Sequence, residues 1–140
     1  MHRTSWPVAI VAALPLLVTA CGSSSADYGM TDKSVSNTSI SAMKGSDGVQ
    51  RVTIDTTDSF RFMPSTIRAH VGKLRILVTD HSAYPHNISV PALHATSKTV
   101  SGNPGQQTTT LVVSLPHPGS YDFVCTFHAS AGMKGHIAVA

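Results

Sequence analysis

The sequence contains no glutamate, and charged residues make up only 12% of its 140 residues. Its ten lysines and arginines are scattered along the chain and form no dense basic block, and the formal net charge is +3. Nucleic-acid binding usually needs a clustered basic surface, and this composition does not favour it. Cysteine is equally scarce, since only Cys21 and Cys125 are present. A framework of several disulfides is therefore excluded, and each cysteine needs its own explanation.

Long apolar runs are also missing, apart from a short one near the N-terminus. Arg3 precedes an apolar run over residues 7–18, which has the length of a signal peptide's apolar part and is short for a membrane span. The run is followed by V-T-A-C, which resembles the bacterial lipobox. This resemblance implies a lipoprotein signal peptide over residues 1–20, export, and a lipid on Cys21 that anchors the protein on the periplasmic or cell-surface side of a membrane. An ordinary secretory signal is the alternative.

Residues 21–48 lack apolar periodicity and are rich in serine, glycine, threonine and aspartate. This composition predicts a flexible tether. From Val49 onward the pattern changes to alternating apolar and polar residues, which is typical of half-buried strands. We therefore expect one folded domain over residues 49–140, without internal repeats.

The strand signals of this domain are separated by turn signals roughly every dozen residues, as in an all-β sandwich or barrel. We expect antiparallel strands, with Pro64 making the second one an edge or bent strand. Residues 91–97 allow a short helix. The expected strands cover residues 49–56, 60–69, 73–80, 86–91, 107–115, 120–127 and 135–140.

Cys125 lies at the end of a strand on which it shares one face with the aromatic residues Tyr121 and Phe123. Two bulky aromatic side chains identify that face as the inward one. His128 and Met133 follow in a glycine-flanked loop, so three donor side chains lie close together in the sequence. If Cys21 is lipidated, Cys125 has no partner for an intramolecular disulfide. A buried hydrophobe, a nucleophile or a metal ligand remain as its roles.

Thiolate, imidazole and thioether form a soft donor set that suits copper, and blue-copper sites use two histidines, one cysteine and a weak axial methionine. His86 in A-Y-P-H-N could supply the second histidine, with His81 as the alternative. Pro85 stiffens its approach, and Asn87 can hydrogen-bond across to the cysteine loop. A nucleophilic pair of Cys125 and His128 is the rival reading, but no third orienting group is evident. The other histidines, His70, His94, His117 and His136, are expected on the surface.

The pattern C-x2-H-x4-M, with P-H-N before it and G-H-I-A-V after it, resembles the plastocyanin and pseudoazurin branch of the cupredoxins. The segment F-M-P-S-T-I-R-A-H-V-G-K resembles the early part of that family. Residue 127 is phenylalanine where plastocyanins usually have proline, and the acidic docking patches of plant plastocyanins have no counterpart.

This resemblance implies a Greek-key β-sandwich with one type 1 copper ion held by His86, Cys125, His128 and Met133, and with Pro85 and Asn87 in supporting positions. It implies a monomeric, non-enzymatic carrier of single electrons that meets redox proteins such as a cytochrome or an oxidase. The alternative is a tethered protein that stores or delivers copper without electron transfer.

Overall fold

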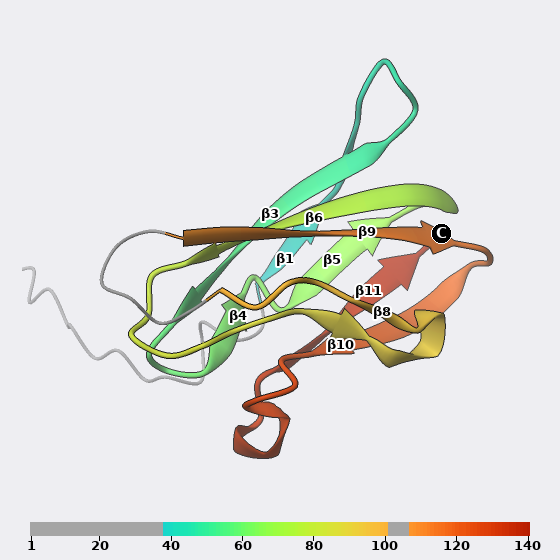
Figure 1. The fold of residues 1–140 in the computed structure, drawn as a ribbon. Coiled ribbons are helices and arrows are strands. Elements are labelled where there is room, and N and C mark those ends of the chain that lie inside the picture. The colour runs from blue at the N-terminus through green and yellow to red at the C-terminus, as the bar shows by residue number, and fades with distance from the viewer. Residues whose placement is uncertain (1–37, 101–106) are drawn as a thin grey trace, which may run out of the picture.

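A computed structural model describes residues 38–100 and 107–140, which fold into two facing β-sheets (Figure 1). One sheet has six strands in the order β1-β5-β11-β10-β7-β8; the other has the order β2-β3-β6-β9, with β4 paired to β3. The strands are β1 (Ser39–Ser41), β2 (Met43–Lys44), β3 (Gln50–Thr57), β4 (Arg61–Met63), β5 (Thr66–Ala69), β6 (Gly72–Asp80), β7 (Ser89–Val90), β8 (Ala95–Thr96), β9 (Gln107–Leu115), β10 (Gly119–Val124) and β11 (Lys134–Val139). The short 3-10 helices η2 (Pro91–Leu93) and η3 (Ala129–Ala131) lie in connections.

The core lies between the two sheets and is built from the alternating residues that the sequence marks as inward. Along β9 every second side chain is buried, and β3 shows the same alternation. Phe62 from one sheet meets Phe123 from the other edge-on, with ring centroids 5.1 Å apart. The predicted all-β sandwich is therefore confirmed, because one buried layer joins two sheets.

The chain changes sheets at Pro64, where one bent strand was predicted. Proline cannot donate a hydrogen bond to a sheet, and the two halves of the segment belong to different sheets, β4 to one and β5 to the other. After this crossing, β6 returns parallel to β3, and β5 pairs parallel to β11. The expected antiparallel pairing is therefore wrong for these two pairs, although it holds for others such as β6 with β9 and β10 with β11.

Among the described residues, the first strand is β1 (Ser39–Ser41), which lies before the predicted boundary at Val49. Strand β1 pairs in parallel with β5, and the Ile40 side chain packs against the core. The end of the expected tether is therefore part of the domain, because a single apolar side chain flanked by polar residues was enough to form an edge strand. Residues 1–37, with the expected leader and Cys21, lie outside the described residues.

The predicted strand over residues 86–91 shrinks to the two residues of β7, and the expected short helix is η2. The loop that joins β10 to β11 extends beyond the ends of these strands (Figure 1). This loop and the segment before β7 meet at one pole of the sandwich. Over residues 38–100 and 107–140, no helix has the length and apolar character needed to cross a membrane.

Candidate metal centre

Cys125 directly follows β10 and points into the core. The ring of Phe123 is completely buried and Tyr121 packs against the core, as their shared face predicts. The thiol itself is also completely buried and forms no disulfide. The alternation of β10 therefore delivers Cys125 to the interior at the point where the strand ends.

Backbone hydrogen bonds fold the loop after Cys125 back on itself. The Cys125 N–H donates to the Met133 carbonyl at 3.1 Å, and the His128 N–H donates to the Cys125 carbonyl at 3.2 Å. The Met133 N–H donates to the His128 carbonyl at 3.1 Å. Gly132, with φ at 87°, ends η3 in the left-handed conformation that glycine adopts without strain. The loop thus has a defined shape that places the Cys125 thiol beside the His128 imidazole and joins the Met133 backbone to both residues.

His86 reaches the same place from another part of the chain. Its backbone exchanges two hydrogen bonds with Val100, of 3.1 and 2.9 Å, and its side chain is completely buried. The next residue, Asn87, connects the two loops: its Nδ2 donates to Thr126 Oγ1 at 2.8 Å, and its Oδ1 accepts the Thr126 N–H at 2.9 Å. Asn87 makes the cross-loop contact that its position suggested, and Thr126 is a partner that the sequence did not reveal.

Three donor atoms converge at this pole, namely Cys125 Sγ, His86 Nδ1 and His128 Nδ1. The sulfur lies 3.7 Å from each nitrogen, and the nitrogens lie 3.3 Å apart. A triangle with these sides has its equidistant point about 2.1 Å from each corner, which falls in the range of about 2.0–2.3 Å at which imidazole and thiolate bind zinc, a first-row metal ion. The donors therefore fit a single metal ion, and among the described residues theirs is the only such group of histidine, cysteine and acidic side chains.

The protonation state of His86 suits this role. Burial lowers the pKa of His86, the neighbouring His128 lowers it further, and Asp80 and Asp58 oppose this change. An imidazole kept neutral can offer the lone pair on Nδ1 to a metal when its proton is on Nε2. Nε2 is buried without a hydrogen-bond partner among the described residues.

Met133, five residues after His128 in the same loop, is completely buried. Its backbone bonds to both Cys125 and His128 hold it at the base of the same loop. A thioether is a weak ligand that suits copper better than zinc.

His128 is the donor that is partly exposed, and aromatic side chains surround it. Phe60 stacks on its ring with centroids 4.2 Å apart and planes 19° apart. Tyr84 and Phe127 lie farther away, at 6.3 and 6.4 Å, and both are about half exposed. Sequence reasoning missed Phe60, because nothing in its local pattern distinguishes it from an ordinary residue at the start of a strand.

The other histidines of residues 38–100 and 107–140 lie outside the donor group. His81, the alternative to His86, is exposed and lies 3.5 Å from Asp55 Oδ1. His70, His94, His117 and His136 are all exposed, as predicted. Pro85 is exposed next to His86.

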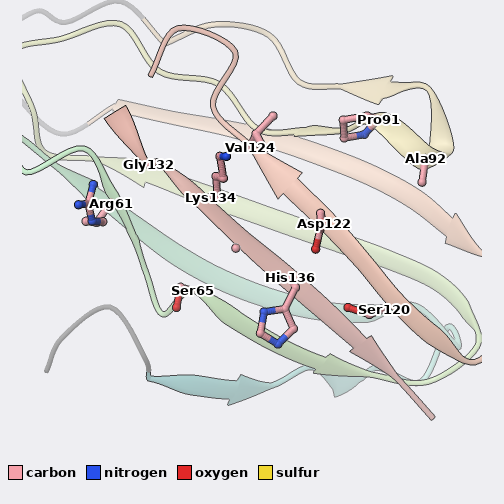
Figure 2. A pocket seen from close by; sticks show the side chains of 11 residues that line it. Arg61, Ser65, Pro91, Ala92, Ser120, Asp122, Val124, Gly132, Lys134 and His136 are labelled. Atoms are coloured by element: carbon pink, nitrogen blue, oxygen red, sulfur yellow. The ribbon is translucent and has the colours of Figure 1, made fainter. Parts of the chain in front are cut away.

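A shallow groove of about 780 Å³ runs along the outer face of β10 and β11 (Figure 2). Arg61 and Gly132 lie at the end near the ligand loop, and Ser120 and His136 lie toward the other end (Figure 2). None of the three donor residues lines this groove. The groove is thus separate from the metal centre, although Arg61, Val124 and Gly132 of its lining adjoin residues of that centre.

Comparison with known proteins agrees with the fold and the donors. The family model of the cupredoxin-like domain matches residues 12–139. Plastocyanin of Lactuca sativa is 29% identical over 89 residues, which cover 56% of this chain and 86% of that protein.

Among solved structures, auracyanin A, a "blue" copper protein from Chloroflexus aurantiacus, has a TM-score of 0.55 at 18% identity and covers 66% of this chain and 100% of its own. The metal-binding domain of a Cu(I)-exporting P-type ATPase from Streptococcus pneumoniae has a TM-score of 0.55 at 17% identity. The match covers 74% of this chain and 97% of that domain. At such identities the likeness concerns the fold alone. Together with the family match and the His86–Cys125–His128 group, it leads to one conclusion: the chain belongs to the cupredoxin-like family and has a site for one copper ion.

Proposed function

We propose that this protein carries single electrons between redox proteins through one type 1 copper ion. The observation that carries the proposal is the convergence of Cys125 Sγ and the two Nδ1 atoms of His86 and His128. We assign these three residues as the strong ligands and Met133 as the weak axial ligand. Copper bound by such a set supplies reversible one-electron chemistry.

The chain's contribution is a rigid and dry frame for the donors. Cys125, His86 and Met133 are completely buried, so water is excluded from most of the site. The Asn87–Thr126 hydrogen bonds and the backbone bonds within the loop hold the donors in place when the charge of the metal changes. Little rearrangement between oxidation states is what fast electron exchange requires.

His128 is the donor through which we expect electrons to enter and leave. Its ring is partly exposed, and the half-exposed rings of Tyr84 and Phe127 lie beside it, with the exposed Pro85 next to Tyr84 in the chain. Redox partners dock on such surfaces with small, short-lived interfaces. A cytochrome or an oxidase-like protein could dock in this way. We expect the protein to be a monomer, which leaves the surface around His128 free for such a partner.

Substrate turnover is not part of this proposal. A nucleophilic Cys125 would need access to a substrate, but its side chain has no exposed surface. Its sulfur lies between two imidazoles, an arrangement better suited to a metal than to an acyl group.

Reconstitution of the purified protein with Cu(II) tests the assignment. We expect an intense blue thiolate-to-copper absorption that disappears in Cys125→Ala and persists in His81→Ala, the matched control outside the donor group. Stopped-flow mixing with a cytochrome c should then show electron exchange. The alternative, copper storage or delivery, rests on the same donors. A colourless complex that holds Cu(I) and passes it to an acceptor would establish that alternative and overturn electron transfer.

Export and lipid anchoring form a separate proposal that rests on the leader and on Cys21, both outside the described residues. Anchoring would keep the carrier near membrane-bound redox proteins. Incorporation of labelled lipid into the wild-type chain and its loss in Cys21→Ala would support it. Equal labelling, or none in either chain, would contradict it.

A further inference from the structure

Phe60 has an unusual relationship to the metal centre. Its ring lies nearly parallel to the His128 imidazole, with centroids 4.2 Å apart and planes 19° apart. Phe127 and Tyr84 approach the same imidazole only at steep angles, 48° and 79°, and at distances above 6 Å. Among the described residues, Phe60 is therefore the aromatic side chain that covers a face of the exposed ligand.

The backbone of Phe60 adopts a conformation that a bulky residue rarely takes. Its φ is 54°, in the left-handed region that favours glycine, asparagine or aspartate. Such strain persists only when surrounding contacts enforce it, and it is concentrated at functional sites. At Phe60 the surrounding contacts include the stack on His128 and the hydrogen bond that its carbonyl accepts from Arg61.

Arg61 supplies the contacts that hold this turn against the ligand loop. Its Nη1 donates to the Phe60 carbonyl at 2.9 Å and to the Ala131 carbonyl at 3.0 Å. Ala131 belongs to η3, three residues after His128. One guanidinium thus connects the turn that presents the phenyl ring to the loop that presents the imidazole, beside the groove that it lines (Figure 2).

The His128 ring needs such support more than the other donors do. His86 is enclosed on all sides, whereas His128 is partly exposed and precedes a three-residue helix of small side chains. The second side-chain torsion of histidine has a broad energy profile, so an unsupported ring would rotate Nδ1 away from Cys125. A stacked ring restricts that rotation and leaves the nitrogen free for the metal.

We propose that Phe60 is a positioning residue for His128, and that Arg61 holds it in that role. The pair preorganises the exposed imidazole for copper and slows the loss of copper through this side of the site. The inference rests on the ligand set of the proposed function but not on electron transfer.

Copper release to excess EDTA, followed by the decay of the thiolate-to-copper absorption, tests the proposal. We expect Phe60→Leu, which keeps an apolar side chain but removes the ring, to release copper roughly two- to twelve-fold faster, the factor that corresponds to one aromatic pair. Phe60→Tyr should restore the wild-type rate because it keeps the ring. His81→Leu, which removes an exposed ring outside the donor group, should leave the rate unchanged.

The metal-free protein offers an independent measurement. The ring protons of His128 should move downfield in the NMR spectrum of Phe60→Leu, because the ring current of the stacked phenyl is lost. If Phe60→Leu does not fold, Arg61→Met serves in its place, since it removes both hydrogen bonds and leaves the phenyl ring intact, and it should also release copper faster.

If Phe60→Leu releases copper at the wild-type rate and its His128 NMR signals are unchanged, the inference about Phe60 is overturned while the proposed function stands. The same holds for Arg61→Met where that variant replaces Phe60→Leu. Equally fast release from Phe60→Leu and Phe60→Tyr would do the same, because the ring would then be irrelevant. Absence of the thiolate-to-copper absorption in the wild type would overturn the ligand set, and with it this inference.

Discussion

His86 shows how burial prepares a single residue for metal binding. Its side chain has no exposed surface, and burial lowers its pKa. In the unfolded chain the same imidazole would titrate near its ordinary value of about 6.5. The folded protein therefore takes up a proton at this position less readily than the unfolded chain does.

This difference predicts how the stability of the metal-free protein depends on pH. Above about pH 6.5 His86 is neutral in both states and contributes no pH dependence. As the pH falls below that value, the unfolded chain binds the proton first, so the free energy of unfolding decreases, by at most about 1.4 kcal/mol per pH unit, until the lowered pKa of the folded state is reached.

Urea unfolding of the metal-free protein between pH 7.5 and 5 measures this loss. His86→Gln should lack this part of it, whereas His81→Gln, at the exposed neighbouring histidine, should retain it. If wild type and His86→Gln lose stability in parallel over this range, burial does not control the protonation of His86.

At the scale of elements, the metal centre depends on two loops from distant parts of the chain. The β10–β11 loop carries Cys125, His128 and Met133, while the segment before β7 carries His86. The Asn87 side chain is the hydrogen-bonded connection between them, and it is 5% exposed. Neither loop alone brings the three strong donors together.

Asn87→Ala should therefore weaken both the fold and the metal site. We expect a loss of about 1–3 kcal/mol in the free energy of unfolding, because a buried hydrogen-bonded group loses its partners. Copper affinity should fall as well, since the two loops are no longer aligned. Thr126→Ser keeps the hydroxyl and the N–H that Asn87 contacts, so it should behave like wild type in urea unfolding and copper titration. Wild-type copper affinity in a folded Asn87→Ala protein would show that the connection is dispensable.

At the scale of the whole molecule, the domain is larger than the segment that carries obvious strand signals. Strand β1 adds an edge to the six-stranded sheet, and the Ala42 N–H donates to the Arg68 carbonyl at 2.8 Å. Ile40 and Ala42 pack against the core. These contacts bind residues 39–44 to the sandwich, although their composition resembles that of a linker.

A chain that starts at Val49 should be less stable than one that starts at Thr38. We expect a loss of about 1–3 kcal/mol in the free energy of unfolding, the scale of burying one large aliphatic side chain. Ile40→Ser in the longer chain should reproduce part of this loss, and Ser39→Ala, at an exposed position, should reproduce none. Equal stability of the two chains in urea would mean that β1 contributes nothing to the fold.

Much of the fold follows from local pattern. The alternation in residues 107–115 predicts β9 correctly to its ends, and the inward direction of Cys125 follows from Tyr121 and Phe123. Local pattern failed where pairing partners decide the outcome, as in the parallel pairing of β3 with β6 and in the edge strand around Ile40. Both depend on which distant segment lies alongside, and no window of sequence contains that information.

The sequence by itself determined the kind of chemistry, because thiol, imidazole and thioether are side-chain properties and their spacing within one loop is local. The resemblance already favoured His86 over His81, but only the tertiary structure brought His86 Nδ1 to 3.7 Å from Cys125 Sγ. It alone placed Phe60 on the face of His128. These relationships join residues 39 to 68 positions apart, and such distances are closed by the packing of two sheets and not by any local preference.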